Sequence, residues 1–122
     1  MAIRNEGTLQ KTYYAGATVN ASRIVKPGAD NTKVVQGAAA TDKLIGVSDS
    51  IGGASGETID VILDGIALVK AGGSIAMGDL ITSDSTGQGV ATTTASNRII
   101  GVAMEDAASG DLFGVRIAPG SV

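Results

Sequence analysis

Residues 58–70 read TIDVILDGIALVK, two apolar runs on either side of Asp64 and Gly65. Aspartate followed by glycine is a strong signal for a two-residue hairpin turn, because both turn positions need a positive φ that these residues tolerate. The stretch therefore predicts a β-hairpin with strands at 58–63 and 66–70. Both runs are apolar at almost every position, which indicates that both faces of the hairpin are covered.

The sequences on the two sides of this stretch resemble each other. Residues 43–47 read KLIGV and residues 98–102 read RIIGV, while residues 54–57 read ASGE and residues 108–111 read ASGD. Two copies are too few for a solenoid, which needs about three or more units to bury a continuous core. We therefore expect two similar units that close on each other into one pseudo-symmetric domain.

The composition favours β structure. The chain has 18 glycines in 122 residues, about twice the usual share, and glycine weakens helices and suits tight turns. The sequence predicts an all-β fold with little helix and two halves at about 16–70 and 72–118. Pro119 is expected to end the last strand because it cannot donate to a ladder. Besides the hairpin, strands are expected at 21–26, 33–36, 43–48, 79–82, 89–93, 98–104 and 111–118.

The first twelve residues stand outside this repeat. Apart from Met1, their apolar residues are Ala2, Ile3 and Leu9, too few to order the segment on a core. We expect a flexible N-terminal arm at 1–12 that pairs with an exposed strand edge of a partner, followed by a single β domain at 13–122. A frayed terminus is the alternative.

Tyr13 and Tyr14 lie where this arm meets the domain. Tyrosine combines apolar area with a polar group, which suits an interface anchor. The alternative is that the pair holds the arm against the body of the domain.

Several classes of chemistry lack the residues they need. The chain has no Cys and no His, which removes disulfides, thiolate and imidazole metal ligands and the Ser-His-Asp triad. No glycine-rich loop fits a phosphate-binding motif, and no acidic segment fits the calcium loop. We therefore expect no catalytic, cofactor-binding or metal-binding residues and no enzymatic activity. A small enzyme that uses carboxylates such as Asp60 or Asp79 is the alternative.

Charge and hydropathy limit the partners. A net charge of −3 argues against nucleic acid, whose phosphates need a clustered basic face. No apolar run approaches the roughly 20 residues of a membrane span, and Met1 is not followed by a secretory signal. We expect a protein that is made in a cytoplasm and binds neither nucleic acid nor membrane.

Short segments of small and apolar residues follow one another in a characteristic order, at residues 15–17, 23–26, 41–49, 54–57, 61–67, 78–82 and 117–121. This order resembles that of the small capsid decoration, or cement, proteins of tailed bacteriophages. The resemblance implies a small antiparallel β-barrel or β-tulip, β-clip-like, related to the lambda head-decoration type. It also implies a homotrimer, made in the host cytoplasm, on the outer capsid surface of the virion. There it would stabilise the mature head by clamping neighbouring subunits of the major capsid protein.

The family often contacts the capsid through an N-terminal arm, so the resemblance implies capsid-binding residues in this segment. They are Ile3, Arg4, Asn5, Leu9, Lys11, Tyr13 and Tyr14. A carbohydrate-binding or adhesive β module of β-clip type is the alternative function, which the string at 78–82 suggests. Such modules usually present aromatic platforms, and this chain has only Tyr13, Tyr14 and Phe113.

Overall fold

The computed structural model describes residues 6–122, with side chains from Leu9 onwards, and in this part of the chain every regular element is a strand. The all-β expectation is therefore confirmed. The strands are β1 Glu6–Ala15, β2 Ile24–Pro27, β3 Lys33–Gln36, β4 Gly46–Ser48, β5 Thr58–Lys70, β6 Leu80–Ser83, β7 Gly89–Ala91, β8 Arg98–Ala103 and β9 Leu112–Ser121.

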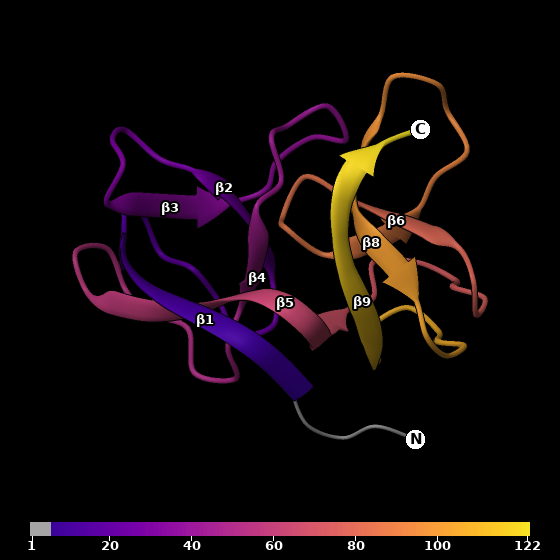
Figure 1. Ribbon diagram of the computed structural model, residues 1–122, viewed down its shortest axis with the longest axis horizontal. Coiled ribbons are helices and arrows are strands. Elements are labelled where there is room, and N and C mark those ends of the chain that lie inside the picture. Colours follow the sequence, from indigo (N-terminus) through magenta and orange to yellow (C-terminus); the bar gives the residue numbers. More distant parts are fainter. Residues whose placement is uncertain (1–5) are drawn as a thin grey trace.

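The first five strands form a closed barrel. Their hydrogen-bonded order is β1-β3-β2-β4-β5, and β1 also pairs with β5, which closes the ring. The barrel is the left-hand part of Figure 1. Closure leaves no unpaired edge between these strands, which is one way small β proteins avoid edge-to-edge aggregation.

β5 is one continuous strand, so the predicted hairpin at 58–70 is wrong. Its first part pairs with β1 and β4, and residues Ile66 to Lys70 pair with β9. Gly65 has φ 90°, and the register with β1 shifts beside Asp64. The residues that suit a hairpin turn here form a bulge, which uses the same positive φ without reversing the chain.

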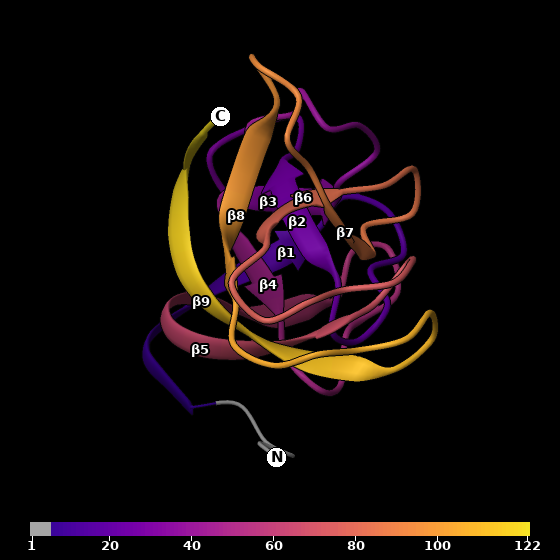
Figure 2. The same cartoon turned by 90° about the vertical axis from the view of Figure 1, so that its right-hand side faces the viewer.

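The second half of the chain repeats the barrel. In the first half Ile24 pairs with Val47 and Val47 with Ile62; in the second half Leu80 pairs with Val102 and Val102 with Arg116. β6, β7, β8 and β9 thus correspond to β2, β3, β4 and the first part of β5. Figure 1 shows the two halves side by side, joined by β5, and in Figure 2 the second half lies in front of the first.

β1 belongs to the repeat. It corresponds to the second part of β5, because Ala15 pairs in parallel with Val34 as Ala71 does with Gly89. The single Ala71–Gly89 bridge closes the second ring. We therefore take residues 6–65 as the first half and 66–121 as the second half.

This corrects the sequence analysis, which placed 1–12 outside the repeat as a free arm. Residues 6–12 pair with β5, from Glu6 opposite Ile66 to Thr12 opposite Asp60. The apolar pattern failed here because the strand is held mainly by backbone pairing along β5. Residues 1–5 lie outside the described residues, so an arm there stays a prediction.

Pro119 does not end the last strand either. β9 continues to Ser121, and its register with β8 shifts between the pairs Ile99–Gly120 and Gly101–Ile117. Pro119 lies within this irregularity, where a ladder hydrogen bond is not required of it.

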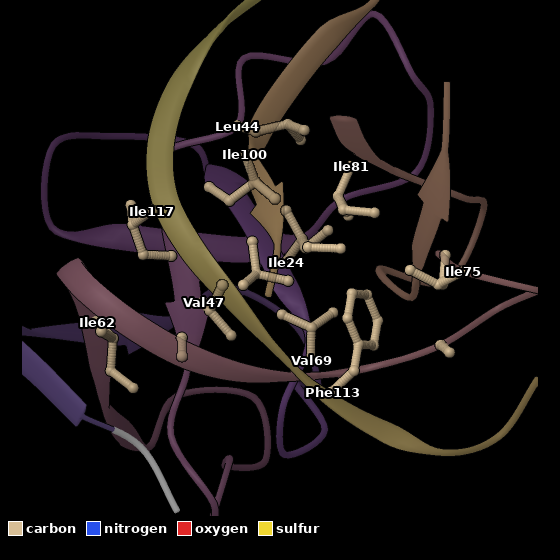
Figure 3. Close-up of a cluster of buried hydrophobic side chains, with 14 residues drawn as sticks. Ile24, Leu44, Val47, Ile62, Val69, Ile75, Ile81, Ile100, Phe113 and Ile117 are labelled. Carbon is tan, nitrogen blue, oxygen red and sulfur yellow. The ribbon is translucent and has the colours of Figure 1, made fainter. Parts of the chain in front are cut away.

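Two apolar clusters fill the halves. The cluster inside the first barrel contains Ala15, Val19, Val25, Val34, Ile59 and Val61. The larger cluster fills the second barrel and extends to the outer face of the first. Figure 3 shows Ile24 and Val47 of the first half at its centre, among Val69, Ile100, Ile117 and Phe113 of the second.

Candidate functional site

The predicted contact residues of β1 divide between its two faces. Successive strand side chains point to opposite faces, so Leu9, Lys11 and Tyr13 share one face and Gln10, Thr12 and Tyr14 the other. Ile3, Arg4 and Asn5 lie outside the described residues. The structure thus brings together only part of the predicted set.

The face with Tyr13 is the inner one. Tyr13 is half-buried and packs against the apolar cluster of the first barrel, as expected of a side chain that holds the strand to the body. The ammonium of Lys11 lies 5.2 Å from the centroid of the Tyr13 ring, a cation–π geometry. Leu9 is 55% exposed.

Tyr14 points the other way and is 50% exposed. Beside it on the outer face, the Thr12 hydroxyl donates a hydrogen bond of 2.8 Å to a carboxylate oxygen of Asp60. The two adjacent tyrosines therefore serve different surfaces, which the sequence did not reveal.

The inner face of β1 continues into one end of the first barrel. Lys11 and Tyr13 pair with Val61 and Ile59 on that face, and Leu63 follows Val61 in the alternation along β5. Lys11 is exposed, while Tyr13 and Leu63 are half-buried. We call these three residues, Lys11, Tyr13 and Leu63, the first-half mouth.

A shallow apolar groove of about 460 Å³ lies on the outer face of the second half. It is lined by Met77, Gly78, Val102, Ala103, Met104, Arg116 and Ala118. Sequence reasoning missed this surface. The available signal was composition, because two of the three methionines of the chain lie here and methionine suits adaptable contact surfaces.

The carboxylates considered for catalysis make structural hydrogen bonds. Asp60 accepts from Thr12, and Asp79 accepts from the Ala76 N–H at 2.9 Å. Between residues 6 and 122 there is no group of three acidic side chains that could hold a metal ion. In that same range no helix could cross a membrane.

Two carboxylates, Asp30 and Asp42, have a pKa below the ordinary value, and Asp42 is the less exposed of the two. Burial raises the pKa of Asp42, but hydrogen bonds from the Ala38 and Ala39 N–H groups and the ammonium of Lys26 outweigh it and hold the pKa below the ordinary 3.8. The Lys26 nitrogen lies 3.1 Å from the carboxylate. This site fixes the loop between β3 and β4 to β2.

The three aromatic rings do not form a platform. Tyr14 is exposed, Tyr13 is half-buried on another face, and Phe113 is fully buried. The stacking surface that a carbohydrate-binding module usually presents is therefore missing from the described residues.

A family model described as phage cement protein matches residues 3–118. The fold is similar to the crystal structure of the head fiber gp8.5 N base in bacteriophage phi29. That match has a TM-score of 0.72 and 25% sequence identity, and covers 90% of this chain and 93% of that one. A search of curated protein sequences found no match.

Proposed function

This chain belongs to the phage cement protein family, and we propose that it binds the outside of the mature capsid as a homotrimer. In this proposal it stabilises the shell by clamping neighbouring subunits of the major capsid protein. The family and the similar head fiber base make it a capsid-associated structural protein of the virion. Neither enzymatic activity nor nucleic-acid binding forms part of the proposed role, and synthesis takes place in the host cytoplasm.

The observation that carries the proposal is the extent of the family match. It spans residues 3–118, so it includes both barrels, the shared strand β5 and the segment of predicted capsid contacts. A match to one barrel alone would support only a common fold unit.

The architecture suits a clamp. Two closed barrels fused through one strand form a body without a long open edge among residues 6–122, and the second half carries a shallow apolar groove. A micromolar contact contributes about −8 kcal/mol, and linking several such contacts raises avidity by about 10² to 10⁴. A trimer that contacts several shell subunits at once therefore needs no single strong site.

The capsid contact is assigned to the N-terminal segment. The proposed residues are Ile3, Arg4, Asn5, Leu9 and Tyr14, whereas Lys11 and Tyr13, which the sequence also predicts as contacts, lie together on the inner face of β1. Among those the structure describes, Leu9 and Tyr14 are exposed large hydrophobic side chains and so are well placed to reach a partner.

Co-sedimentation with heads of the encoding phage tests the function. We expect the purified protein to bind expanded, mature heads and to leave unexpanded heads bare, because its site needs the subunit spacing of the mature shell. Binding only the mature form also stabilises it by mass action, so decorated heads should resist heat better than bare heads. Mature heads that stay bare at saturating protein would refute the proposal, and equal binding to both forms would refute the selectivity.

A further inference from the structure

The two halves contact each other through surfaces that the repeat makes twice. On the first half the contact surface is the outer face of the barrel, where Ile24, Val47 and Ile62 are each 0% exposed. We call these three residues the first-half wall. They belong to the same apolar cluster as Ala67, Val69 and Ile117 of the second half. We call these last three residues the second-half mouth. Figure 3 shows Val47 and Ile24 between Ile117 and Val69.

The strand pairing gives each of these residues a counterpart in the other half. Val47 corresponds to Val102 and Ile62 to Arg116, because each two residues form the equivalent strand pair in their half. Ile24 corresponds to Leu80, because they pair with Val47 and Val102. Leu80, Val102 and Arg116 therefore form the second-half wall. The residues of the two mouths correspond in the same way. Ala67 pairs with Val115 as Lys11 pairs with Val61, so Ala67 corresponds to Lys11. Val69 pairs with Phe113 as Tyr13 pairs with Ile59, so Val69 corresponds to Tyr13. Leu63 corresponds to Ile117.

The counterparts are uncovered. Leu80 and Val102 are half-buried and Arg116 is exposed, whereas all three residues of the first-half wall are fully buried. Likewise Lys11 is exposed and Tyr13 and Leu63 are half-buried, whereas Ala67 and Val69 are fully buried. Within one chain the first-half wall therefore contacts the second-half mouth. The first-half mouth and the second-half wall stay uncovered.

We infer that the second-half wall of one copy docks on the first-half mouth of another copy, which repeats between chains the contact that joins the two halves within a chain. The intrachain contact is the template, because it shows that a wall and a mouth of this fold fit each other. The groove over Met77, Met104 and Arg116 lies on that wall.

The residue exchanges between the two contacts fit this assignment. Where the permanent intrachain contact has Ile62 and Val69, the free surfaces have Arg116 and Tyr13, and two methionines border the wall. Arginine, tyrosine and methionine are enriched at protein interfaces. An arginine stem packs on apolar surface and its guanidinium stacks on aromatic rings, so these exchanges keep the separate chain soluble while they preserve a docking surface.

The contact is heterologous, since a wall meets a mouth. Heterologous contacts form closed rings when the rotation between copies closes, and filaments when it does not. The inference therefore deepens the proposed homotrimer by naming the surfaces that form it. It predicts that every chain in the ring uses both of its free surfaces.

Blocking one surface at a time tests the inference. Met77→Lys with Met104→Lys blocks the wall, and both residues are exposed, at 66% and 37%, so the fold should persist. Tyr13→Lys blocks the mouth. In analytical ultracentrifugation we expect the wild type to sediment as a discrete oligomer and each variant as a single chain of 12.0 kDa.

An equimolar mixture of the two variants gives the sharpest result. The wall variant keeps a normal mouth and the mouth variant a normal wall, so the mixture should form a dimer and nothing larger. Ile51→Lys is the matched control, because Ile51 is apolar and 83% exposed but belongs to neither surface. It should assemble like the wild type.

Cross-linking tests the same contact without the Tyr13→Lys variant, in case that variant does not fold. The chain has no cysteine, so Lys11→Cys and Met104→Cys each introduce one thiol at an exposed position. A flexible bis-maleimide should cross-link a mixture of the two variants into heterodimers and leave each variant alone largely uncross-linked.

Three outcomes would overturn the inference: a monomeric wild type, variants that assemble like the wild type, or cross-links within one thiol variant but not between the two. Head binding is measured separately. Oligomers that assemble as inferred but leave mature heads bare would count against the proposed function and leave this inference standing.

Discussion

The packing of Phe113 shows how the two halves diverged at single residues. Phe113 takes the place of Ile59, and Gly89 takes the place of Val34. A Cβ atom on Gly89 would lie 3.0 Å from Cζ of Phe113 and from side-chain carbons of Ile81 and Val69. The second half therefore has a larger side chain at Phe113 and no side chain at Gly89, where the first half has Ile59 and Val34. The two exchanges together preserve the packing density that protein cores require.

This exchange predicts a strong coupling between the two positions. We expect Gly89→Val to destabilise the protein by about 1–3 kcal/mol through overpacking and Phe113→Ile to cost about 1–3 kcal/mol by leaving a cavity. The double variant restores the pair found in the first half, so its loss should fall below the sum by at least about 1 kcal/mol. Urea unfolding of the four proteins measures this, and additive losses would contradict the assigned correspondence.

The turns at 54–57 and 108–111 depend on one backbone angle. Gly110 has φ +90°, and a Cβ atom added to it would meet no heavy atom within 4 Å, while Gly73 has equally open space without a positive φ. We expect Gly110→Ala to destabilise by about 1–2 kcal/mol, because a left-handed conformation strains residues with a Cβ. Gly73→Ala should be neutral or stabilise by up to about 1 kcal/mol. Equal shifts in the urea midpoint of the two variants would show that φ is not the cause.

At the scale of elements, the sequence predicts correctly those strands and turns that depend on neighbouring residues. It fails for those that depend on pairing with strands distant in the sequence. β3 lies at 33–36 as predicted, and the repeated ASGE and ASGD segments form equivalent turns closed by Glu57 and Asp111. The Asp64–Gly65 prediction failed because those residues suit a hairpin turn and a bulge equally. The choice depends on β1 and β9 pairing along β5, and those strands are distant in sequence.

The loop between β3 and β4 gives a prediction about pH. The folded pKa of Asp42 lies below its ordinary value of 3.8, so its interactions stabilise the fold above about pH 4. This contribution is lost as the pH falls through the folded pKa. We expect the Tm to drop between pH 4 and pH 2, and Asp42→Asn to have a lower Tm at pH 7 and a smaller drop.

The control for this prediction is Lys26→Met. It removes the ammonium but keeps the hydrogen bonds from Ala38 and Ala39, so its pH dependence should lie between those of the wild type and Asp42→Asn. A Tm profile of Asp42→Asn parallel to that of the wild type would show that other carboxylates cause the acid sensitivity.

At the scale of the whole molecule, the sequence revealed the duplication but not its consequence. The similarity of residues 43–47 and 98–102 predicts two equivalent units. It cannot predict that one unit covers its neighbour's outer face and leaves its own uncovered, because that depends on how the halves pack. Comparing counterparts such as Ile62 and Arg116 locates the free wall only once the strand register is known.

The boundary between arm and barrel gives the last prediction. Three proposed capsid contacts, Ile3, Arg4 and Asn5, precede β1, whose pairing with β5 begins at Glu6. Deleting residues 1–5 should therefore leave the fold and the oligomer unchanged, whereas deleting 1–12 would also remove β1 pairs that close the first barrel. A trimer loses all three arms at once, so its affinity for mature heads should fall by at least about 100-fold.

Quantitative co-sedimentation, with Tyr14→Ala in the full-length chain as the comparison, separates the contributions of arm and strand. Undiminished binding by the shortened chain, together with a large loss for Tyr14→Ala, would move the capsid contact from the arm to the outer face of β1.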